Sequence, residues 1–257
     1  MTNMVGPLSG VHMLITRPVK FASRTAERLA ALGATPIIFS TIIIEPPEDI
    51  GHVKAALSSL QSVYAIIFVS PSAVEMIFKD NIKLPISVKV FAPGLGTAEE
   101  LSLYGVNNVR IPLKSFDSEG LLELSELQSE FVNGQRILIF RGNGGRELLF
   151  DELRRRGAKV EIATAYRRSI PTTPATGLLE LLSAKRVTAI SIMSSSAIKN
   201  LVAIVPKQDR KSLLFSLPVY ASHKRIKDTT ESLGFLNVIE TESGDKGLIT
   251  TLLRNKS

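Results

Sequence analysis

Residues 11–47 read VHMLITRPVKFASRTAERLAALGATPIIFSTIIIEPP, and residues 135–171 read QRILIFRGNGGRELLFDELRRRGAKVEIATAYRRSIP. The two stretches align without a gap at an offset of 124 residues, which places Arg17 on Arg141. Both begin with an apolar run, continue through an amphipathic stretch and a glycine, and end in a second apolar run that closes on proline. The chain therefore carries two copies of one strand–helix–strand unit.

The repeat extends well beyond these stretches. SPSAV at 70–74 falls on SSSAI at 194–198 at the same offset, and VFAPGLGTAEELSLYGVNNV at 90–109 matches VYASHKRIKDTTESLGFLNV at 219–238 at an offset of 129. A repeat of this length is a domain rather than a solenoid unit. We therefore expect two similar domains, with a cleft between them as a candidate ligand site.

Strand and helix patterns alternate within each copy. Residues 11–16 predict a strand, and residues 22–33 carry leucine and alanine at helical spacing, with Gly33 suited to the left-handed position after the helix. Further strands are expected at 35–40, 41–46, 64–70, 88–94 and 106–112, and further helices at 72–80, 96–105 and 118–127. Apolar strands that alternate with helices indicate a parallel sheet covered on both faces. The predicted fold class is α/β, with two flavodoxin-like, doubly wound parallel-sheet domains.

Prolines indicate how the two domains are wired. Pro46 and Pro47 in the first copy, and Pro171 and Pro174 in the second, lie at equivalent linker-like places. Equivalent linkers favour a chain that crosses between the domains twice, so that the domains are intertwined. The predicted domains are 1–44 plus 172–257, and 45–171, with linkers near 41–48 and 165–174. The alternative is two tandem domains divided near residue 130.

Composition excludes several kinds of site. The 257 residues include no cysteine, so disulfides, thiolate metal sites and cysteine nucleophiles are excluded. His12, His52 and His223 are scattered without the spacing of metal ligands, so we expect no metal site. The first ten residues lack the pattern of a secretory signal, and the apolar run at 35–47 is too short to span a bilayer. We expect a soluble, cytoplasmic protein that does not act at a membrane.

The net charge is +7, with basic clusters at 154–156, 167–168 and 224–225. These clusters are explained either by solvated helix faces or by a positive cleft that attracts an anionic small molecule. Nucleic acid is disfavoured as a partner, because tryptophan is absent and the other aromatic residues are not interleaved with the basic ones.

The stretch RGNGGRE at 141–147 joins an apolar strand to a helical pattern. Gly142 and Gly144 would let backbone N–H groups approach an anion at a helix start. Glu147 stands where a dinucleotide fingerprint needs its third glycine, and no Walker lysine follows. The alternative is simply a tight turn.

Hydroxyl groups follow several predicted strands. Gly96 and Thr97 lie in such a position, and Thr97 with Glu100 three residues later predicts a capping box, which by itself would explain the threonine. Further hydroxyls that end strands belong to Ser70, Ser72, Ser194 and Ser195. Ligands of these sheets bind at the carboxyl ends of strands. No histidine or carboxylate is placed to activate the serines, so a nucleophilic triad is rejected.

Tyr166 departs from the repeat, because its counterpart is Ile42 on an apolar strand. A phenol near the linker could donate a proton or a hydrogen bond to a ligand. The alternative is a half-buried strand tyrosine without a chemical role.

Taken together, these segments resemble the uroporphyrinogen-III synthase family. The resemblance rests on motifs in family order along nearly the whole chain: ITRP, the Ser-x-x-Ala-Val element at 70–74, GLGTAEEL at 94–101, RGNGGREL at 141–148, RGAKVEIATAYRR at 156–168 and MSSSAIKNL at 193–201. It implies intertwined flavodoxin-like domains joined by a two-stranded linker. It also implies a lyase that needs no cofactor and cyclises hydroxymethylbilane, with inversion of the D ring and loss of water.

The resemblance also implies roles for single residues. Tyr166 matches the family's candidate proton donor, and Thr97 matches a threonine of the family's cleft. A second threonine motif of many members is missing at 221–226, where Ser222 is the candidate replacement. The complete expected substrate-binding set is Arg17, Ser70, Ser72, Gly96, Thr97, Arg141, Gly142, Gly144, Ser194, Ser195 and Ser222.

A protein of another class remains an alternative on sequence alone, namely a two-domain binding or sensor protein for an anionic metabolite that catalyses nothing. Its fold and charge would be the same. We expect a monomer, with transient contact to the enzyme that supplies the unstable substrate as a further candidate interaction.

Overall fold

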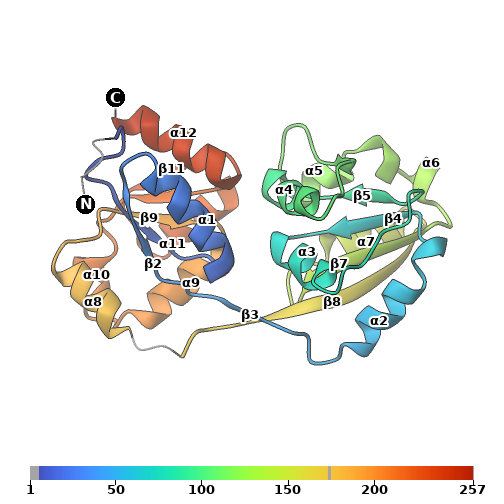
Figure 1. Cartoon of the computed structure of the whole chain (residues 1–257), viewed down its shortest axis with the longest axis horizontal. Helices are drawn as coiled ribbons and strands as arrows, with labels where there is room; N and C mark the ends of the chain where they lie inside the picture. The colour runs from blue at the N-terminus through green and yellow to red at the C-terminus, as the bar shows by residue number, and fades with distance from the viewer. Residues whose placement is uncertain (1–5, 173–174, 257) are drawn as a thin grey trace. The chain divides into compact units, whose positions relative to one another are not determined.

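The computed structural model describes residues 6–172 and 175–256, so residues 173–174 of the expected second linker lie outside the described residues. The chain forms two compact units, one from 1–43 with 169–257 and one from 44–168. Each is an α/β unit built on its own sheet (Figure 1). The predicted α/β class, with two mostly parallel sheets, is confirmed.

The first unit contains a five-stranded sheet in the order β11-β10-β9-β1-β2. Its strands are β1 (His12–Ile15), β2 (Thr35–Ile38), β9 (Ala189–Ile192), β10 (Val219–Ala221) and β11 (Val238–Glu240). Its helices are α1 (Val19–Ala30), α8 (Thr176–Ser183), α9 (Ser195–Ile204), α10 (Arg210–Leu213), α11 (Lys224–Ser232) and α12 (Gly244–Lys256). The strands of this sheet pair in parallel.

The second unit contains a six-stranded sheet in the order β3-β8-β7-β4-β5-β6. Its strands are β3 (Ile43–Glu45), β4 (Ala65–Phe68), β5 (Lys89–Phe91), β6 (Val109–Arg110), β7 (Arg136–Gly142) and β8 (Lys159–Ser169). Its helices are α2 (Gly51–Ser58), α3 (Pro71–Phe78), α4 (Leu95–Leu103), α5 (Ser118–Leu122), α6 (Ser129–Val132) and α7 (Leu148–Arg155), with 3₁₀ turns η1 (Leu60–Ser62) and η2 (Ser125–Leu127). The chain passes between the units in β3 and β8, which are neighbours in this sheet.

The two copies of the repeat exchange strands. In the first sheet, β1 and β2 come from the first copy and β9, β10 and β11 from the second; in the second sheet, β7 and β8 come from the second copy and β4, β5 and β6 from the first. The second sheet also carries β3 of the first copy at its edge. Apart from β3, and counted in the order of one copy, both sheets read 2-1-3-4-5, which is the flavodoxin-like order.

The pairing register of the strands follows the same 124-residue offset as the sequence repeat. Met13 pairs with Ala189 where β1 meets β9, and Ile137 pairs with Ala65 where β7 meets β4. Both pairs obey the 124-residue offset, with the copies interchanged. Because register decides which face each side chain takes, the two sheets bury equivalent positions.

Helices cover both faces of the first sheet. Leu29 of α1 and Leu248 of α12 pack on one face, whereas Leu182 of α8, Leu201 of α9 and Ile226 of α11 pack on the other. Each face thus has its own apolar core, as in a three-layer α/β domain.

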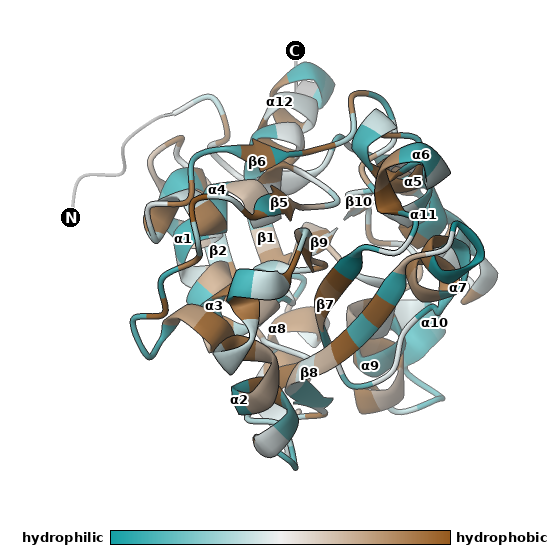
Figure 2. Ribbon diagram, turned by 90° about the vertical axis from the view of Figure 1, so that its right-hand side faces the viewer, coloured by the Kyte–Doolittle hydropathy of each residue, from teal (hydrophilic) through white to brown (hydrophobic). Residues whose placement is uncertain are grey.

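The second sheet is covered in the same way. Val53 of α2, Ile77 of α3 and Leu101 of α4 pack on one face, and Leu121 of α5 and Leu153 of α7 on the other. Figure 2 shows β7 as hydrophobic along most of its length, while β8 is banded. The banding fits the burial of β8, in which only Ala163, Ala165 and Tyr166 are buried, whereas residues 137–140 of β7 are all buried.

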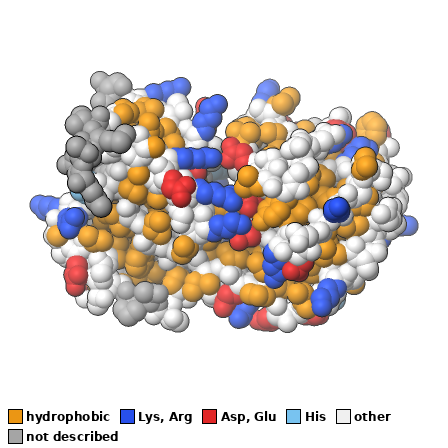
Figure 3. Space-filling view, in the orientation of Figure 1, with side chains coloured by type: hydrophobic (Ala, Val, Ile, Leu, Met, Phe, Trp, Pro, Cys, Tyr) orange, Lys and Arg blue, Asp and Glu red, His pale blue; other side chains and the backbone are white. Residues whose placement is uncertain are grey.

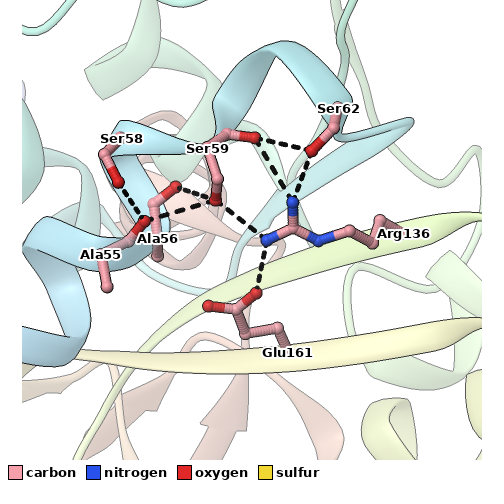
Figure 4. A network of polar contacts seen from close by, with 7 residues as sticks. All are labelled: Ala55, Ala56, Ser58, Ser59, Ser62, Arg136 and Glu161. Atoms are coloured by element: carbon pink, nitrogen blue, oxygen red, sulfur yellow. Dashed lines mark hydrogen bonds and ion pairs between the residues drawn. The ribbon is translucent and has the colours of Figure 1, made fainter.

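The amino end of β7 is fastened to the segment before β4 (Figure 4). Arg136 donates to the Ser59 and Ser62 hydroxyl groups and forms an ion pair of 2.8 Å with Glu161 of β8. His12, the counterpart of Arg136, contacts the Arg186 carbonyl oxygen at 3.1 Å, before β9. The contacts of Arg136 with the serines and of His12 with Arg186 each join one copy to the other, at the amino ends of the strands.

Two local expectations can be compared with the structure. The single helix expected at 118–127 is wrong, because the backbone of Leu124 is extended and separates α5 from η2. Gly33 has φ +87°, as the sequence predicted for the turn after α1.

Candidate functional site

Polar groups collect where the strand order reverses. In the second sheet this point lies between β7 and β4, and in the first between β1 and β9. Connections leave these neighbouring strands in opposite directions, and ligands of such sheets bind at the carboxyl ends there.

A β-bulge aims Tyr166 into the second unit. Arg141 pairs with Thr164, but Gly142 pairs with Tyr166, so that one residue of β8 is extra. Ala165 and Tyr166 consequently join the same apolar cluster, although successive strand residues normally face opposite sides. A bulge that redirects one side chain is common beside active sites.

The Tyr166 phenol is held by two side chains. Its oxygen lies 3.0 Å from the Ser70 hydroxyl and accepts a hydrogen bond of 3.0 Å from Nη2 of Arg168. The Arg168 guanidinium also lies 5.5 Å from the centre of the tyrosine ring. Tyr166 is only 1% exposed, so it is more buried than the half-buried strand tyrosine of the alternative interpretation.

The loop after β7 is fitted against this ring. A Cβ atom on Gly142 would lie 2.6 Å from Cζ of Tyr166, closer than atoms can pack. The Asn143 amide donates to the Tyr166 carbonyl oxygen, and the Arg168 amide donates to the Asn143 side chain, both at 2.8 Å. Gly142 is therefore required by the close approach of the tyrosine.

Ion pairs hold the remainder of the 141–147 loop. Arg141 Nη2 donates to Glu147 at 2.6 Å, and Arg146 forms a two-pronged pair with Glu119. The Nε atom of Arg141 is buried and has no hydrogen-bond partner among the described residues. Gly144 has φ +65°, which allows the tight turn. Arg141 of this loop therefore keeps one N–H donor, at Nε, that bonds no described residue.

Ser70 begins α3 as its N-cap and accepts a hydrogen bond of 3.2 Å from the Ala73 amide. Ser72 lies in the first turn of the same helix and is buried.

Gly96 and Thr97 lie at the start of α4. The predicted capping box is wrong: Gly94 is the N-cap, so Thr97 lies inside the first turn and Glu100 further along the helix. Thr97 is buried, and a Cβ atom on Gly96 would meet nothing within 4 Å. Capping therefore does not explain the threonine.

Arg17 follows β1 in the first unit and is already paired. Its Nη1 donates to Asp245 at 2.7 Å, and Thr25 donates to the same carboxylate oxygen at 2.9 Å. Arg28 reaches the other oxygen of Asp245 at 3.2 Å. Burial lowers the pKa of Arg17, and Asp245 opposes that shift, so the guanidinium stays charged.

Basic side chains continue along α1. Lys20, Arg24 and Arg28 are spaced four residues apart, which places them on one side of the helix. Figure 3 shows basic side chains gathered over this helix. The first unit thus presents a basic helix next to the carboxyl end of β1.

The other hydroxyls of the first unit follow β9 and β10. Ser194 is the N-cap of α9 and accepts from the Ala197 amide at 3.2 Å, as Ser70 does from Ala73. Ser195 bonds Thr229 of α11 at 3.2 Å. Ser222 is buried directly after β10.

The structure thus distributes the expected site over both units. The second unit holds Ser70, Ser72, Gly96, Thr97, Arg141, Gly142, Gly144 and Tyr166, and the first holds Arg17, Ser194, Ser195 and Ser222. Sequence reasoning missed Arg168 as a partner of Tyr166 and treated it only as part of a basic cluster. It also missed Asp245, which lies 228 residues from Arg17 and has no local signal.

Residues 6–172 and 175–256 contain neither a cluster of metal-binding side chains nor a helix that could span a membrane. No group of three or more His, Cys, Asp or Glu side chains is arranged to hold a metal ion there. No helix in this part of the chain is long and apolar enough to cross a membrane.

Comparisons with known proteins agree with the resemblance. A family model described as uroporphyrinogen-III synthase HemD matches residues 23–250. The uroporphyrinogen-III synthase of Salmonella typhimurium is 28% identical over 248 residues, covering 95% of this chain and 100% of that protein. The enzyme of Proteus mirabilis is 32% identical over 165 residues, covering 62% of this chain and 80% of that protein.

Solved structures show the same fold at low identity. A mutant uroporphyrinogen III synthase from the extremely thermophilic bacterium Thermus thermophilus matches with a TM-score of 0.57 at 19% identity, covering 96% of this chain and 100% of that chain. The uroporphyrinogen-III synthetase of Helicobacter pylori matches with a TM-score of 0.58 at 12% identity, covering 95% of this chain and 99% of that chain.

Proposed function

The chain belongs to the uroporphyrinogen-III synthase family, and from this premise we propose that it cyclises hydroxymethylbilane to the type III uroporphyrinogen. The match of the family model to residues 23–250 carries the proposal. The Tyr166 phenol supports it, because its hydrogen bond to Ser70 connects an acid to the β7–β4 switch point, where ligands of such folds bind.

The chemistry asks little of the protein beyond one proton and accurate positioning. The bond between the hydroxymethyl carbon and its oxygen breaks, and the oxygen leaves as water after taking a proton. Electrons of the pyrrole stabilise the cation that remains, and the substituted carbon of ring D then attacks it. Ring D inverts because that carbon gives up its bond to the methylene bridge of ring C, and the bridge rejoins at the unsubstituted α-carbon of ring D. Holding ring D for that attack, rather than bond making itself, is the larger part of the catalysis, and a general acid assists.

Substrate carboxylates would be held by N–H groups, hydroxyls and arginines. Each pyrrole carries an acetate and a propionate, and such groups bind well to guanidinium and to backbone amides. We assign this role to the expected substrate-binding set, and to Tyr166 the role of proton donor. Arg17 and Arg141 would each bind substrate while keeping their carboxylate partner.

The competing function, a non-catalytic binding protein, has weaker support, because the relatives that match over most of this chain are named as synthases. Turnover separates the two. With freshly generated hydroxymethylbilane in large excess over protein, we expect nearly all of the substrate to become the type III isomer, whereas substrate left to itself closes without inverting ring D. A binding protein would change at most one equivalent of substrate per chain.

Monomeric state, a cytoplasmic site of action and transient contact with the upstream synthase remain predictions. Size-exclusion chromatography at several protein concentrations tests the first of them, with a constant elution volume as the expected result.

A further inference from the structure

The burial of Tyr166 separates its phenol from any ligand. At 1% exposure the tyrosine offers no surface to a substrate outside the sheet. Ser70, which touches the phenol oxygen at 3.0 Å, is only half-buried and reaches the surface. A proton that leaves the phenol toward a ligand therefore passes the Ser70 hydroxyl.

The donors and acceptors around the phenol determine that Tyr166 donates its hydrogen bond to Ser70. Arg168 has only donors, so the phenol oxygen accepts from it. The phenol proton then needs an acceptor, and Ser70 is the acceptor within its reach among the described residues. Ser70 also accepts from the Ala73 amide, so its own proton is left to point away from both groups.

We infer that Ser70 is the catalytic group that hands the proton to the substrate, that Tyr166 replaces this proton, and that Arg168 is a positioning residue for the phenol. This deepens the proposed function and rests on it. The geometry that carries it is a chain of three groups, Arg168, Tyr166 and Ser70, each within 3.0 Å of the next.

Every proton that the relay gives to the substrate is replaced by the end of the reaction. The Ser70 O–H bond breaks as the leaving oxygen becomes water, and Ser70 takes the phenol proton. Charge left on the Tyr166 oxygen is stabilised by the Arg168 donor and its positive charge. The methylene bridge from ring C then leaves the substituted carbon of ring D and rejoins at the unsubstituted α-carbon. That carbon loses its proton as ring D regains its aromatic form, and the proton returns through Ser70 to the phenol.

The repeat supplies a comparison within the molecule. Ser194 caps α9 with the same 3.2 Å bond to an amide, but Ile42 stands where the phenol would be. Capping is thus common to both serines, whereas the contact to a tyrosine belongs to Ser70. Loss of the cap and loss of the relay can be measured separately.

A double-mutant cycle tests the relay. Single-turnover rates of type III formation are measured for the wild type, Tyr166→Phe, Ser70→Asn and the double variant. Asparagine keeps the N-cap but carries no transferable hydroxyl proton. Because both changes break one pathway, each is expected to slow the reaction by about 100-fold, the low end of general acid catalysis, and the double variant no further. Ser70→Thr, which keeps a hydroxyl, should recover most of the rate.

Three outcomes would overturn the relay. These are a near wild-type rate for Ser70→Asn, a near wild-type rate for Tyr166→Phe, and a double variant whose loss is the product of the single losses. Arg168→Gln should slow the wild type but not the Tyr166→Phe variant, and equal slowing of both would remove Arg168 from the relay. A wild type that forms no type III isomer would instead contradict the proposed function.

Stability controls use the repeat. Ser194→Ala loses only a cap and should lower the Tm by about 3 °C. Ser70→Ala loses the same cap and also the acceptor of the buried Tyr166 phenol, so it should lower the Tm further. Any rate loss in Ser194→Ala should multiply with that of Tyr166→Phe, because Ser194 bonds the Ala197 amide and belongs to the other unit. If Ser194→Ala instead slows the wild type but causes no further rate loss in the Tyr166→Phe variant, the non-additivity is not specific to Ser70, and the relay is contradicted.

Discussion

Gly142 permits the position of Tyr166, because any side chain at residue 142 would collide with the phenol ring. Tyr166 in turn is the residue at which the repeat breaks, with Ile42 as its counterpart. The sequence could therefore point to both residues, one through a glycine-rich loop and one through the mismatch. It could not reveal the bulge that brings them together, because a bulge depends on strand pairing.

Gly142→Ala tests this close contact. The new methyl group would overlap Cζ of Tyr166, and overpacking of this kind costs about 1–3 kcal/mol. Gly96→Ala is the control, since its methyl group meets nothing within 4 Å. Urea unfolding should show the loss for Gly142→Ala alone, and equal stabilities of both variants would contradict the contact.

Asp245 gives a second test at the scale of single residues. Its side chain is 8% exposed and pairs Arg17, whereas Glu147, which pairs the equivalent Arg141, is 49% exposed. Removing one partner of a buried pair leaves a charge without compensation, so Asp245→Asn should cost about 3 kcal/mol. Glu147→Gln should cost less than about 1 kcal/mol. Unfolding free energies in the reverse order would refute this difference in burial.

At the scale of elements, sequence patterns located helices better than their ends. The start of α4 was misplaced because Gly94, which has no side chain, occupies the N-cap in place of Thr97. The 118–127 helix is interrupted, and Arg156 of the α7 end donates to the Leu122 and Leu127 carbonyls at 2.8 Å, on either side of the break. A contact between distant elements thus replaces helical hydrogen bonds, which local periodicity does not show.

The α7 end makes stability depend on pH. Arg155 and Arg156 hydrogen-bond Glu152 and lower its pKa from 4.5 to about 2. A carboxyl with a depressed pKa in the folded state stabilises the fold above its unfolded pKa, and this contribution fades as pH falls from 4.5 toward 2. Thermal unfolding should show Glu152→Gln less stable than wild type at neutral pH, with the gap narrowing between about pH 5 and pH 3. A gap that does not change with pH would contradict this role of Glu152.

At the scale of the whole molecule, the sequence repeat predicted more than the number of domains. One offset of 124 residues relates the register of β1 with β9 to that of β7 with β4. The prolines at equivalent places in the two copies, near residues 46 and 171, predicted that the two domains are intertwined. The repeat alone could not predict which copy supplies the partner of a given strand. Both copies have the same pattern of residues, so β4 could pair in the same register with β1 or with β7. Side chains decide it: Phe140 of β7 stacks on Phe68 at 5.2 Å, and its counterpart in the first copy is Thr16.

Fragments test this exchange of strands. Residues 44–168 contain nearly all of the second sheet and are continuous in sequence, so this fragment should unfold cooperatively in urea. Residues 1–130 contain one repeat copy but separate β4 from β7, and they should show no cooperative transition. The opposite pattern would favour tandem domains divided near residue 130.

The central claim is that this chain directs ring closure to the type III isomer. Hydroxymethylbilane closes spontaneously without inverting ring D, so isomer composition reports the protein's action directly. Freshly generated substrate is mixed with increasing amounts of protein, and the oxidised products are separated by chromatography. We expect the type III fraction to rise with protein concentration until little type I remains. A type I product at every protein concentration, from a chain shown to be folded, would contradict it.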